Sequence, residues 1–367
     1  MSQRRYRLWT SGLFLLGMVL AVAACGPSLS GVVALEEQVA DNTTTAVMVN
    51  DKYLYSIQND KLVTYSISDA AKPKRLGQQD SFKGPHLGMV RFGASQMLIM
   101  GTDGTVQVFD ISSPESPLPI WGVGKTLKIK YPGPFVLRSN PLVMYTSPGD
   151  GIAIARIELG ELTKPDADQG NLDAATTKID GGGGGGILLP LNFDSIPVAL
   201  YVGNKQTGKV DYWSVAEIEA KSAKEPKSSL DVKAGNSVDK LFLYTNSDNT
   251  RGYLVVAGSG GDLEYFDLGN EYNSVASPTA LEGAAGSVPK VSIMDQKRKR
   301  FFTTELGVYE FTDFSTGKDF VAPALWGQPE TRATIDVQAM AVHPTKDVLY
   351  VGESAGLRTY TFSAKSN

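Results

Sequence analysis

The stretch from Met97 to Pro117, MLIMGTDGTVQVFDISSPESP, carries the clearest structural signal in this chain of 367 residues. It joins an apolar run, the pair Asp103-Gly104, an alternating strand-like run and a loop marked by prolines. An Asp-Gly pair between two apolar runs predicts a β-hairpin, because it tolerates the positive φ angles of a tight turn. One hairpin cannot bury its apolar face in water, so it must pack against others like it.

Weaker copies of this unit recur along the whole chain. The turn pairs stand at Asn59-Asp60, Asp103-Gly104, Asp150-Gly151, Thr207-Gly208, Gly260-Gly261, Leu306-Gly307 and Ala355-Gly356. The second residues of successive pairs are 44, 47, 57, 53, 46 and 49 positions apart. Each pair lies between two strand-like runs, and a third apolar run, such as Thr45–Val49 in the first unit, precedes them. Seven units with a period of about 50 residues predict a closed ring or a stacked array.

The fold class predicted from these units is all-β, a seven-bladed β-propeller of four-stranded antiparallel blades. Weaker runs such as Lys74–Gly77 and Leu118–Trp121 supply the fourth strands. The seventh unit ends without one, whereas Gly31–Val39 has no blade of its own. We therefore expect the N-terminal strand to close the last blade and so remove an exposed sheet edge. A stacked β-solenoid is the alternative. It is disfavoured because solenoid repeats are shorter than the period of about 50 residues found here.

The first 24 residues have the layout of a secretory signal peptide. Three arginines precede an apolar run from Leu8 to Val19, and small residues follow. The segment Val22-Ala23-Ala24-Cys25 resembles a bacterial lipobox, which implies cleavage after Ala24 and acylation of Cys25. An uncleaved anchor helix is the alternative, but an apolar run of about 17 residues is at the short limit for a membrane span.

The expected boundaries are a removed signal peptide at 1–24, a lipidated tether at 25–30 and one propeller domain at 31–367. Acyl chains on Cys25 imply a membrane anchor, because each buried methylene contributes about 0.8 kcal/mol. The implied location is the bacterial cell envelope. It is the outer membrane in a Gram-negative host, because Gly26 rather than Asp follows the cysteine, and otherwise the outer face of the cytoplasmic membrane. Cys25 is the only cysteine, so no disulfide is expected.

The composition is that of an ordinary globular protein, with 42% hydrophobic and 20% charged residues. Residues 1–24 hold three of the 35 basic side chains and none of the 39 acidic ones. The mature chain therefore carries 32 basic and 39 acidic side chains, a formal charge of −7. This charge disfavours a nucleic acid or an anionic lipid surface as the main partner.

Four stretches resemble known propeller repeats. Leu98–Pro117 and Leu54–Pro73, LYSIQNDKLVTYSISDAAKP, resemble the LVIVD-type repeat of bacterial surface propellers. Ala341–Tyr360, AVHPTKDVLYVGESAGLRTY, and Leu200–Trp213, LYVGNKQTGKVDYW, are similar to YVTN and lactonase-like propellers. These resemblances imply the fold more than the function. The WD dipeptide of WD40 blades and the docking pattern of quinoprotein-like blades are absent, so no cofactor is expected.

Catalytic and metal-binding patterns are sparse. His86 and His343 are the only histidines. His343, in Val-His-Pro, is expected to cap a turn. His86 is expected in the loop that enters the second blade, on the face around the mouth of the central channel. There it is the one candidate for a general base or ligand. No G-x-S-x-G elbow, Walker loop or H-E-x-x-H helix occurs. The sequence therefore predicts no catalytic residue and no metal site.

Other polar segments are assigned structural roles. The stretch 158–186 is interpreted as an insert that breaks the repeat, and the hexaglycine at its end, Gly181–Gly186, predicts a floppy surface connection. Glu217–Ser229 predicts one or two helical turns before Pro226. The run Lys297–Arg300 predicts a solvated hairpin between inner strands of the sixth blade. Four aspartates stand singly in tight turns, where an Asp side chain is expected to bond the turn backbone rather than to bind calcium. They are Asp60, Asp103, Asp150 and Asp262.

A binding rim is expected on one face of the propeller. The turns between second and third strands and the connections between blades lie there, around the mouth of the central channel. Mixed charges, amides and a tyrosine suit a protein or a small ligand. The candidate rim residues are Asn59, Lys83, His86, Asp103, Tyr131, Asp150, Lys205, Gln206, Asn236 and Arg332.

These features favour a lipid-anchored propeller that is not an enzyme and that binds other envelope or surface proteins as a scaffold. A different class of function is a lactonase-like envelope hydrolase that uses a site around His86. A third is a structural subunit that exists only inside a large envelope complex.

Overall fold

The computed structural model describes residues 29–81, 84–121, 129–139, 142–156, 176–181, 183–188, 199–232, 237–245, 252–258, 261–268, 279–280, 286–287, 291–312, 323–329 and 336–365. Within these ranges the fold is all-β, with a single short helix, α3 (Val215–Glu219). The predicted signal peptide with Ala24, and Cys25 with the predicted tether up to residue 28, lie outside them.

Four sheets have four strands each in simple antiparallel order. The first contains β2 (Thr44–Val49), β3 (Tyr53–Gln58), β4 (Lys61–Ser66) and β5 (Lys74–Asp80). The second contains β6 (His86–Phe92), β7 (Gln96–Gly101), β8 (Val106–Asp110) and β9 (Leu118–Trp121). The third contains β10 (Phe135–Ser139), β11 (Leu142–Thr146), β12 (Gly151–Arg156) and β13 (Thr176–Asp180). The fourth contains β14 (Gly184–Leu188), β15 (Ala199–Asn204), β16 (Lys209–Ser214) and β17 (Ser228–Asp231).

Two larger sheets complete the part of the fold that the structure describes. The five-stranded sheet contains β18 (Val238–Thr245), β19 (Gly252–Gly258), β20 (Asp262–Asp267), β21 (Thr279–Ala280) and β22 (Gly286–Ser287). The eight-stranded sheet runs in the order β23 (Val291–Asp295), β24 (Arg300–Thr303), β25 (Val308–Glu310), β26 (Ala324–Pro329), β1 (Gly31–Ala40), β29 (Gly356–Ala364), β28 (Val348–Glu353) and β27 (Val337–Val342).

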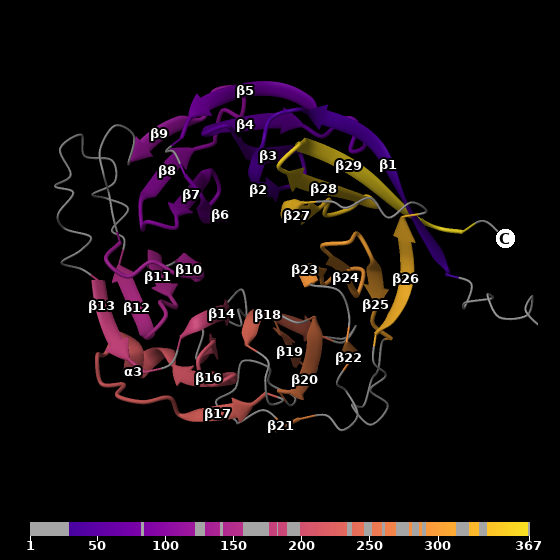
Figure 1. Cartoon of the computed structure of the whole chain (residues 1–367). Helices are drawn as coiled ribbons and strands as arrows, with labels where there is room; N and C mark the ends of the chain where they lie inside the picture. The colour runs from indigo at the N-terminus through magenta and orange to yellow at the C-terminus, as the bar shows by residue number, and fades with distance from the viewer. Residues whose placement is uncertain are drawn as a thin grey trace, which may run out of the picture.

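The sheets stand side by side in a ring, which gives a propeller-like fold (Figure 1). The innermost strands in this view are β2, β6, β10, β14, β18, β23 and β27. The core is divided into clusters between neighbouring sheets. One cluster, for example, joins Leu98 and Val108 of the second sheet to Met144 of the third. This stacking buries the apolar face that a lone hairpin would leave in water.

The strand boundaries agree closely with the predicted units. The inner run expected at Thr45–Val49 is β2, and the outer run expected at Leu118–Trp121 is β9. In the first turn pair, Asn59 and Asp60 have φ angles of 46° and 63°. Positive φ at both central residues is the geometry that a two-residue hairpin requires.

The N-terminal strand pairs with the last strand of the chain, as predicted. β1 pairs antiparallel with β29, with Val33 opposite Phe362. It also makes a parallel pairing with β26, with Gly31 opposite Gly327. The sequence did not predict this second pairing, which joins two sets of four strands into one sheet. β1 therefore has hydrogen-bonded neighbours on both sides.

Strand direction divides the connections between two faces. The rim face carries the turns β3–β4, β7–β8, β11–β12, β15–β16, β24–β25 and β28–β29, together with the connections from one sheet to the next. The opposite face carries the turns β2–β3, β6–β7, β23–β24 and β27–β28 and the start of β1. These two names are used below.

The hexaglycine is not the floppy connection that composition predicted. Gly184 to Gly186 begin the inner strand β14, and Gly185 and Gly186 are buried. A Cβ on Gly185 would lie 2.7 Å from the Gly203 carbonyl oxygen, and one on Gly186 would lie 2.8 Å from the Cα of Lys240. Glycine is needed here because the backbones of neighbouring strands approach too closely for a side chain.

The segment 158–186 is likewise not one insert, because it contains β13 as well as the start of β14. Residues 157–175 lie outside the described ranges. The helical turn expected after Glu217 is found as α3, and Ser214 caps its N-terminus by accepting from the Glu217 backbone N–H. Among the described residues, no helix has both the length and the apolar character needed to cross a membrane.

Candidate functional site

Seven of the ten predicted rim residues lie in the described part of the chain, on connections or strand ends of the rim face. They are Asn59, His86, Asp103, Tyr131, Asp150, Lys205 and Gln206. Lys83, Asn236 and Arg332 fall outside the described residues.

Three of these residues come together beside the third and fourth sheets. The side-chain amide of Gln206 donates to the Gly149 carbonyl at 3.2 Å, next to Asp150. Asp150 accepts from the Lys178 ammonium at 2.6 Å, and that ammonium also lies 5.4 Å from the centre of the Tyr131 ring. We name the surface formed by Tyr131, Asp150, Lys178 and Gln206 the rim cluster.

The rim cluster is polar and partly open to solvent. The Asp150 side chain is 68% exposed, whereas that of Lys178 is 16% exposed and also contacts Asp180 at 3.0 Å. Hydrogen bonds to these two carboxylates raise the pKa of Lys178, so its charge is retained at neutral pH. Lys178 was not predicted, because it lies on an outer strand inside the segment that was taken for an insert.

His86 begins β6 at the edge of the same face and is half-buried. Its Nδ1 lies 3.3 Å from the Thr45 hydroxyl oxygen. Burial lowers the pKa of His86, and the nearby Asp60 carboxylate opposes that shift. A neutral imidazole in this position can accept or donate one hydrogen bond at each nitrogen according to its tautomer.

Asn59 and Asp103 stabilise their own connections. The Asn59 amide donates to the Asn42 side chain at 2.9 Å. The Asp103 carboxylate accepts from the Thr105 backbone N–H and hydroxyl. This is the local bonding expected of aspartate in a tight turn. Within the described residues, no three His, Cys, Asp or Glu side chains gather closely enough to hold a metal ion.

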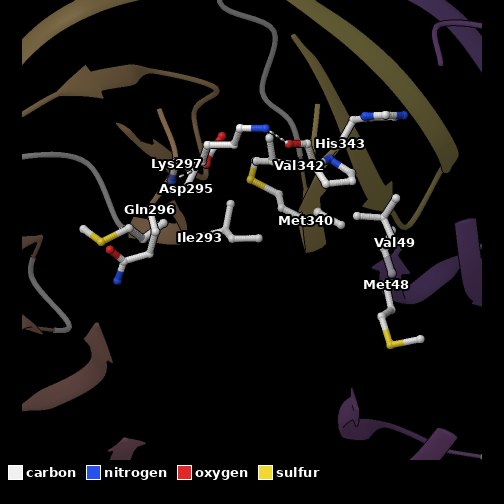
Figure 2. Close-up of a pocket in the computed structure, with 13 residues that line it drawn as sticks. Met48, Val49, Ile293, Asp295, Gln296, Lys297, Met340, Val342 and His343 are labelled. Carbon is white, nitrogen blue, oxygen red and sulfur yellow. Dashed lines mark hydrogen bonds between the residues drawn. The ribbon is translucent and has the colours of Figure 1, made fainter. Parts of the chain in front are cut away.

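A cavity lies at the other end of the inner strands, on the opposite face (Figure 2). Its volume is about 530 Å³, and residues of β2, β23 and β27 line it, together with the turns that follow β23 and β27. The sequence did not predict it, because apolar residues on inner strands are also typical of core. The binding rim and this cavity are therefore two separate candidate sites.

The three turns that follow β2, β23 and β27 share a capping pattern, of which sequence reasoning found only the His343 cap. Asn50 Oδ1 accepts from the backbone N–H groups two and three residues later, and Asp295 Oδ1 does the same. In the β27–β28 turn, His343 Nδ1 accepts from the N–H groups of Thr345 and Lys346 at 3.1 and 3.0 Å. The expectation that His343 caps a turn is confirmed.

We expect His343→Asn to remove a pH-dependent loss of stability. Burial, with help from Arg298 and Lys346, holds the pKa of folded His343 below its ordinary 6.5. Between the two values the unfolded state binds more protons, so the free energy of unfolding falls as the pH drops below about 6.5. Asparagine can cap the turn as Asn50 does, and it does not titrate.

Urea denaturation over a pH series measures this effect as the difference between wild type and His343→Asn. As the pH falls, the free energy of unfolding of wild type should decrease relative to that of His343→Asn. His343→Ala lacks the cap at every pH and should lose about 1 kcal/mol. A difference between wild type and His343→Asn that is independent of pH would show that His343 does not titrate in this way.

The run Lys297–Arg300 is only partly the solvated hairpin that was predicted. It lies at the β23–β24 turn, and Lys297 is exposed. The side chain of Arg298, however, is only 14% exposed; it pairs with Asp295 and, at 2.8 Å, with Asp347 of the next turn. Arg298 can pair with both carboxylates because a guanidinium donates to several acceptors at once.

A buried polar group at the end of β28 was also missed. Glu353 is 3% exposed and pairs with Arg358 at 3.1 Å, and it lies 3.4 Å from the Tyr360 hydroxyl. Burial raises the pKa of Glu353. The Glu353–Tyr360 contact spans seven residues, and the first sheet has a similar contact. There the Gln58 amide donates to the hydroxyl of Tyr65, seven residues later, at 2.9 Å. A polar residue followed seven positions later by tyrosine is the signal that could have found this group.

Fold and sites together define a propeller-like all-β protein with a polar rim on one face and an apolar cavity on the other. No sequence profile of a known protein family matches the chain, and no curated protein matches it in sequence. Among solved structures, it is similar to the crystal structure of Chaetomium thermophilum Raptor, with a TM-score of 0.58 at 10% identity. The match covers 90% of this chain and 30% of that chain. At this identity the likeness concerns the fold alone.

Proposed function

We propose that the ring is a seven-bladed β-propeller. The five separate sheets count as five blades, and the eight-stranded sheet divides at the β26–β1 junction into β23-β24-β25-β26 and β27-β28-β29-β1. Pairing across that junction is parallel, whereas pairing within each set is antiparallel. The resulting count equals the number of turn pairs in the sequence.

We further propose that the protein is a lipid-anchored, non-catalytic scaffold of the bacterial envelope. It would sit in the outer membrane of a Gram-negative host, or otherwise on the outer face of the cytoplasmic membrane. β1 begins at Gly31 on the opposite face, six residues after Cys25. Acyl chains on Cys25 would then hold the opposite face towards the membrane. The rim face would point away from it, towards other envelope or surface proteins.

The rim cluster is the observation that carries this proposal. It joins side chains from two consecutive sheets into one surface of amide, carboxylate, ammonium and aromatic groups. Such a mixture suits a polar protein interface. The partner would be another subunit of an envelope complex, recognised by the loops of a rigid ring.

Asp150→Arg is expected to reduce recovery of the partner at least about fivefold, because it reverses a charge at the interface. The measurement is a pull-down of the tagged full chain from its native membranes, with identification of proteins that co-purify in fixed ratio. Glu225→Arg makes the same charge change at an exposed position in the connection between α3 and β17, outside the rim cluster, and should leave recovery unchanged.

Three results would contradict parts of this proposal. Equal recovery with Asp150→Arg and wild type would exclude the rim cluster as the interface. A wild-type protein that purifies as a clean monomer would contradict the scaffold. Mass spectrometry that finds Cys25 without acyl chains would contradict the anchor and leave the other two conclusions standing.

The second candidate function is a lactonase-like envelope hydrolase, which the environment of His86 favours. A half-buried imidazole with a lowered pKa, beside the Thr45 hydroxyl, could act as a general base at neutral pH. The test is a panel of lactones and sugar esters with wild type and His86→Ala. Turnover that His86→Ala abolishes would support the hydrolase, and a panel left intact would remove it.

A further inference from the structure

The cavity on the opposite face has the size and composition of a site for an aliphatic ligand. Its volume of about 530 Å³ lies within the range of roughly 300–1,000 Å³ for small-molecule pockets. Nine of its thirteen lining residues are apolar, and none carries a Phe, Tyr or Trp ring. A planar ligand would therefore find only the His343 imidazole to stack on, whereas an alkyl chain would find a largely aliphatic wall.

Methionines and branched side chains from three inner strands make this wall. Met48 comes from β2, Ile293 and Met294 from β23, and Met340 and Val342 from β27. Figure 2 shows Met48, Ile293 and Met340 beside the same open space. Unbranched thioether side chains adapt their shape to a flexible chain at little cost.

A positive charge stands at the edge of this apolar wall. Lys297 lines the cavity, and among the described residues its ammonium has one hydrogen bond, to the Pro344 carbonyl at 3.5 Å (Figure 2). Both carboxylates nearby, Asp295 and Asp347, are occupied by Arg298. A ligand that carries its own negative charge would therefore supply the counter-ion that Lys297 lacks here.

The turns around the cavity carry more positive than negative side chains. The β2–β3, β23–β24 and β27–β28 turns, with the cap residue Asp295, carry five cationic side chains and three carboxylates. The cations are Lys52, Lys297, Arg298, Lys299 and Lys346, and the carboxylates are Asp51, Asp295 and Asp347. The local field thus favours an anion even though the whole chain is acidic.

We propose that this cavity binds a fatty acid. Its single alkyl chain would lie against Met48, Ile293 and Met340, and its carboxylate would pair with Lys297. The site is distinct from the rim cluster and from His86, and it does not depend on acylation of Cys25. It would give the protein a second binding function on the face that carries the start of β1.

A photoreactive dodecanoic acid, with a diazirine at its terminal carbon, tests this assignment. The full chain is labelled in membranes, and the adducts are located by peptide mass spectrometry. We expect adducts on the peptides that contain Met48, Ile293 and Met340, and competition by unlabelled dodecanoate. Lys297→Met should lower this labelling about threefold to fivefold, the effect expected of one partly exposed ion pair.

Two controls make the result decisive. Lys224→Met removes an exposed charge that lies outside the cavity lining and outside the three turns around it, and it should leave labelling unchanged. The matching photoreactive alcohol should label wild type and Lys297→Met equally and weakly. Adducts spread over other surfaces, or equal labelling of wild type and Lys297→Met by the acid, would overturn the proposal.

Discussion

Replacing Val33 with aspartate is expected to destabilise the protein by roughly 4 kcal/mol or more. Val33 is 2% exposed and lies in a core cluster with Trp326, Phe302 and Phe362. Its strand, β1, pairs with β29 on one side and β26 on the other. A carboxylate there would be buried without a partner, in the strand that joins the two ends of the chain. Urea denaturation followed by tryptophan fluorescence measures the loss.

The same strand offers a matched control. Leu35 lies two residues further along β1, and its side chain is 56% exposed. Leu35→Asp should therefore change the free energy of unfolding by no more than about 0.5 kcal/mol. If Val33→Asp proves as mild as Leu35→Asp, β1 is not part of the folded core, and closure of the ring by the N-terminal strand is wrong.

Glu219→Ala is expected to cost about 3 kcal/mol, because it leaves a buried arginine without a counter-charge. Arg138 Nη2 lies 2.8 Å from Glu219 Oε1, and the two side chains are 7% and 20% exposed. The Tyr145 hydroxyl donates to the same carboxylate oxygen. Arg138 and Tyr145 belong to the third sheet and Glu219 to α3 after β16, so this contact attaches α3 to the neighbouring sheet.

Two further variants separate burial of charge from simple loss of a contact. Glu217→Ala removes the more exposed pair with Lys227 and should cost no more than about 1 kcal/mol. The double variant Arg138→Met with Glu219→Ala removes both buried charges and should recover much of the stability. A double variant that is no more stable than Glu219→Ala would show that the buried charge is not the cause. Thermal and urea unfolding measure both variants.

Much of the fold follows from the sequence because hairpins are local. The pair Asn59-Asp60 and the runs that became β2 and β9 depend on neighbours a few residues away. The closing role of residues 31–39 followed from counting, since the last unit lacked a strand. The parallel contact of β1 with β26 did not follow, because it joins segments that only the closed ring brings together.

The candidate sites divide in the same way. Tyr131, Asp150 and Gln206 were found because each lies in or beside a turn whose place in the repeat is readable. Lys178 was missed because its strand, β13, lies inside the stretch 158–186, which was taken for an insert. The cavity was missed because the apolar residues of inner strands have the same pattern whether they face the core or an opening.

By itself the sequence determined the repeated hairpin, the all-β class and the positions of most turns, because backbone preference and alternation act over short distances. Only the tertiary structure decided which glycines of 181–186 are packed and which carboxylates pair with the arginines of 297–300. It also decided that the rim cluster and the cavity lie on different faces. These outcomes depend on how closely distant strands approach, and that distance is a property of the assembled ring.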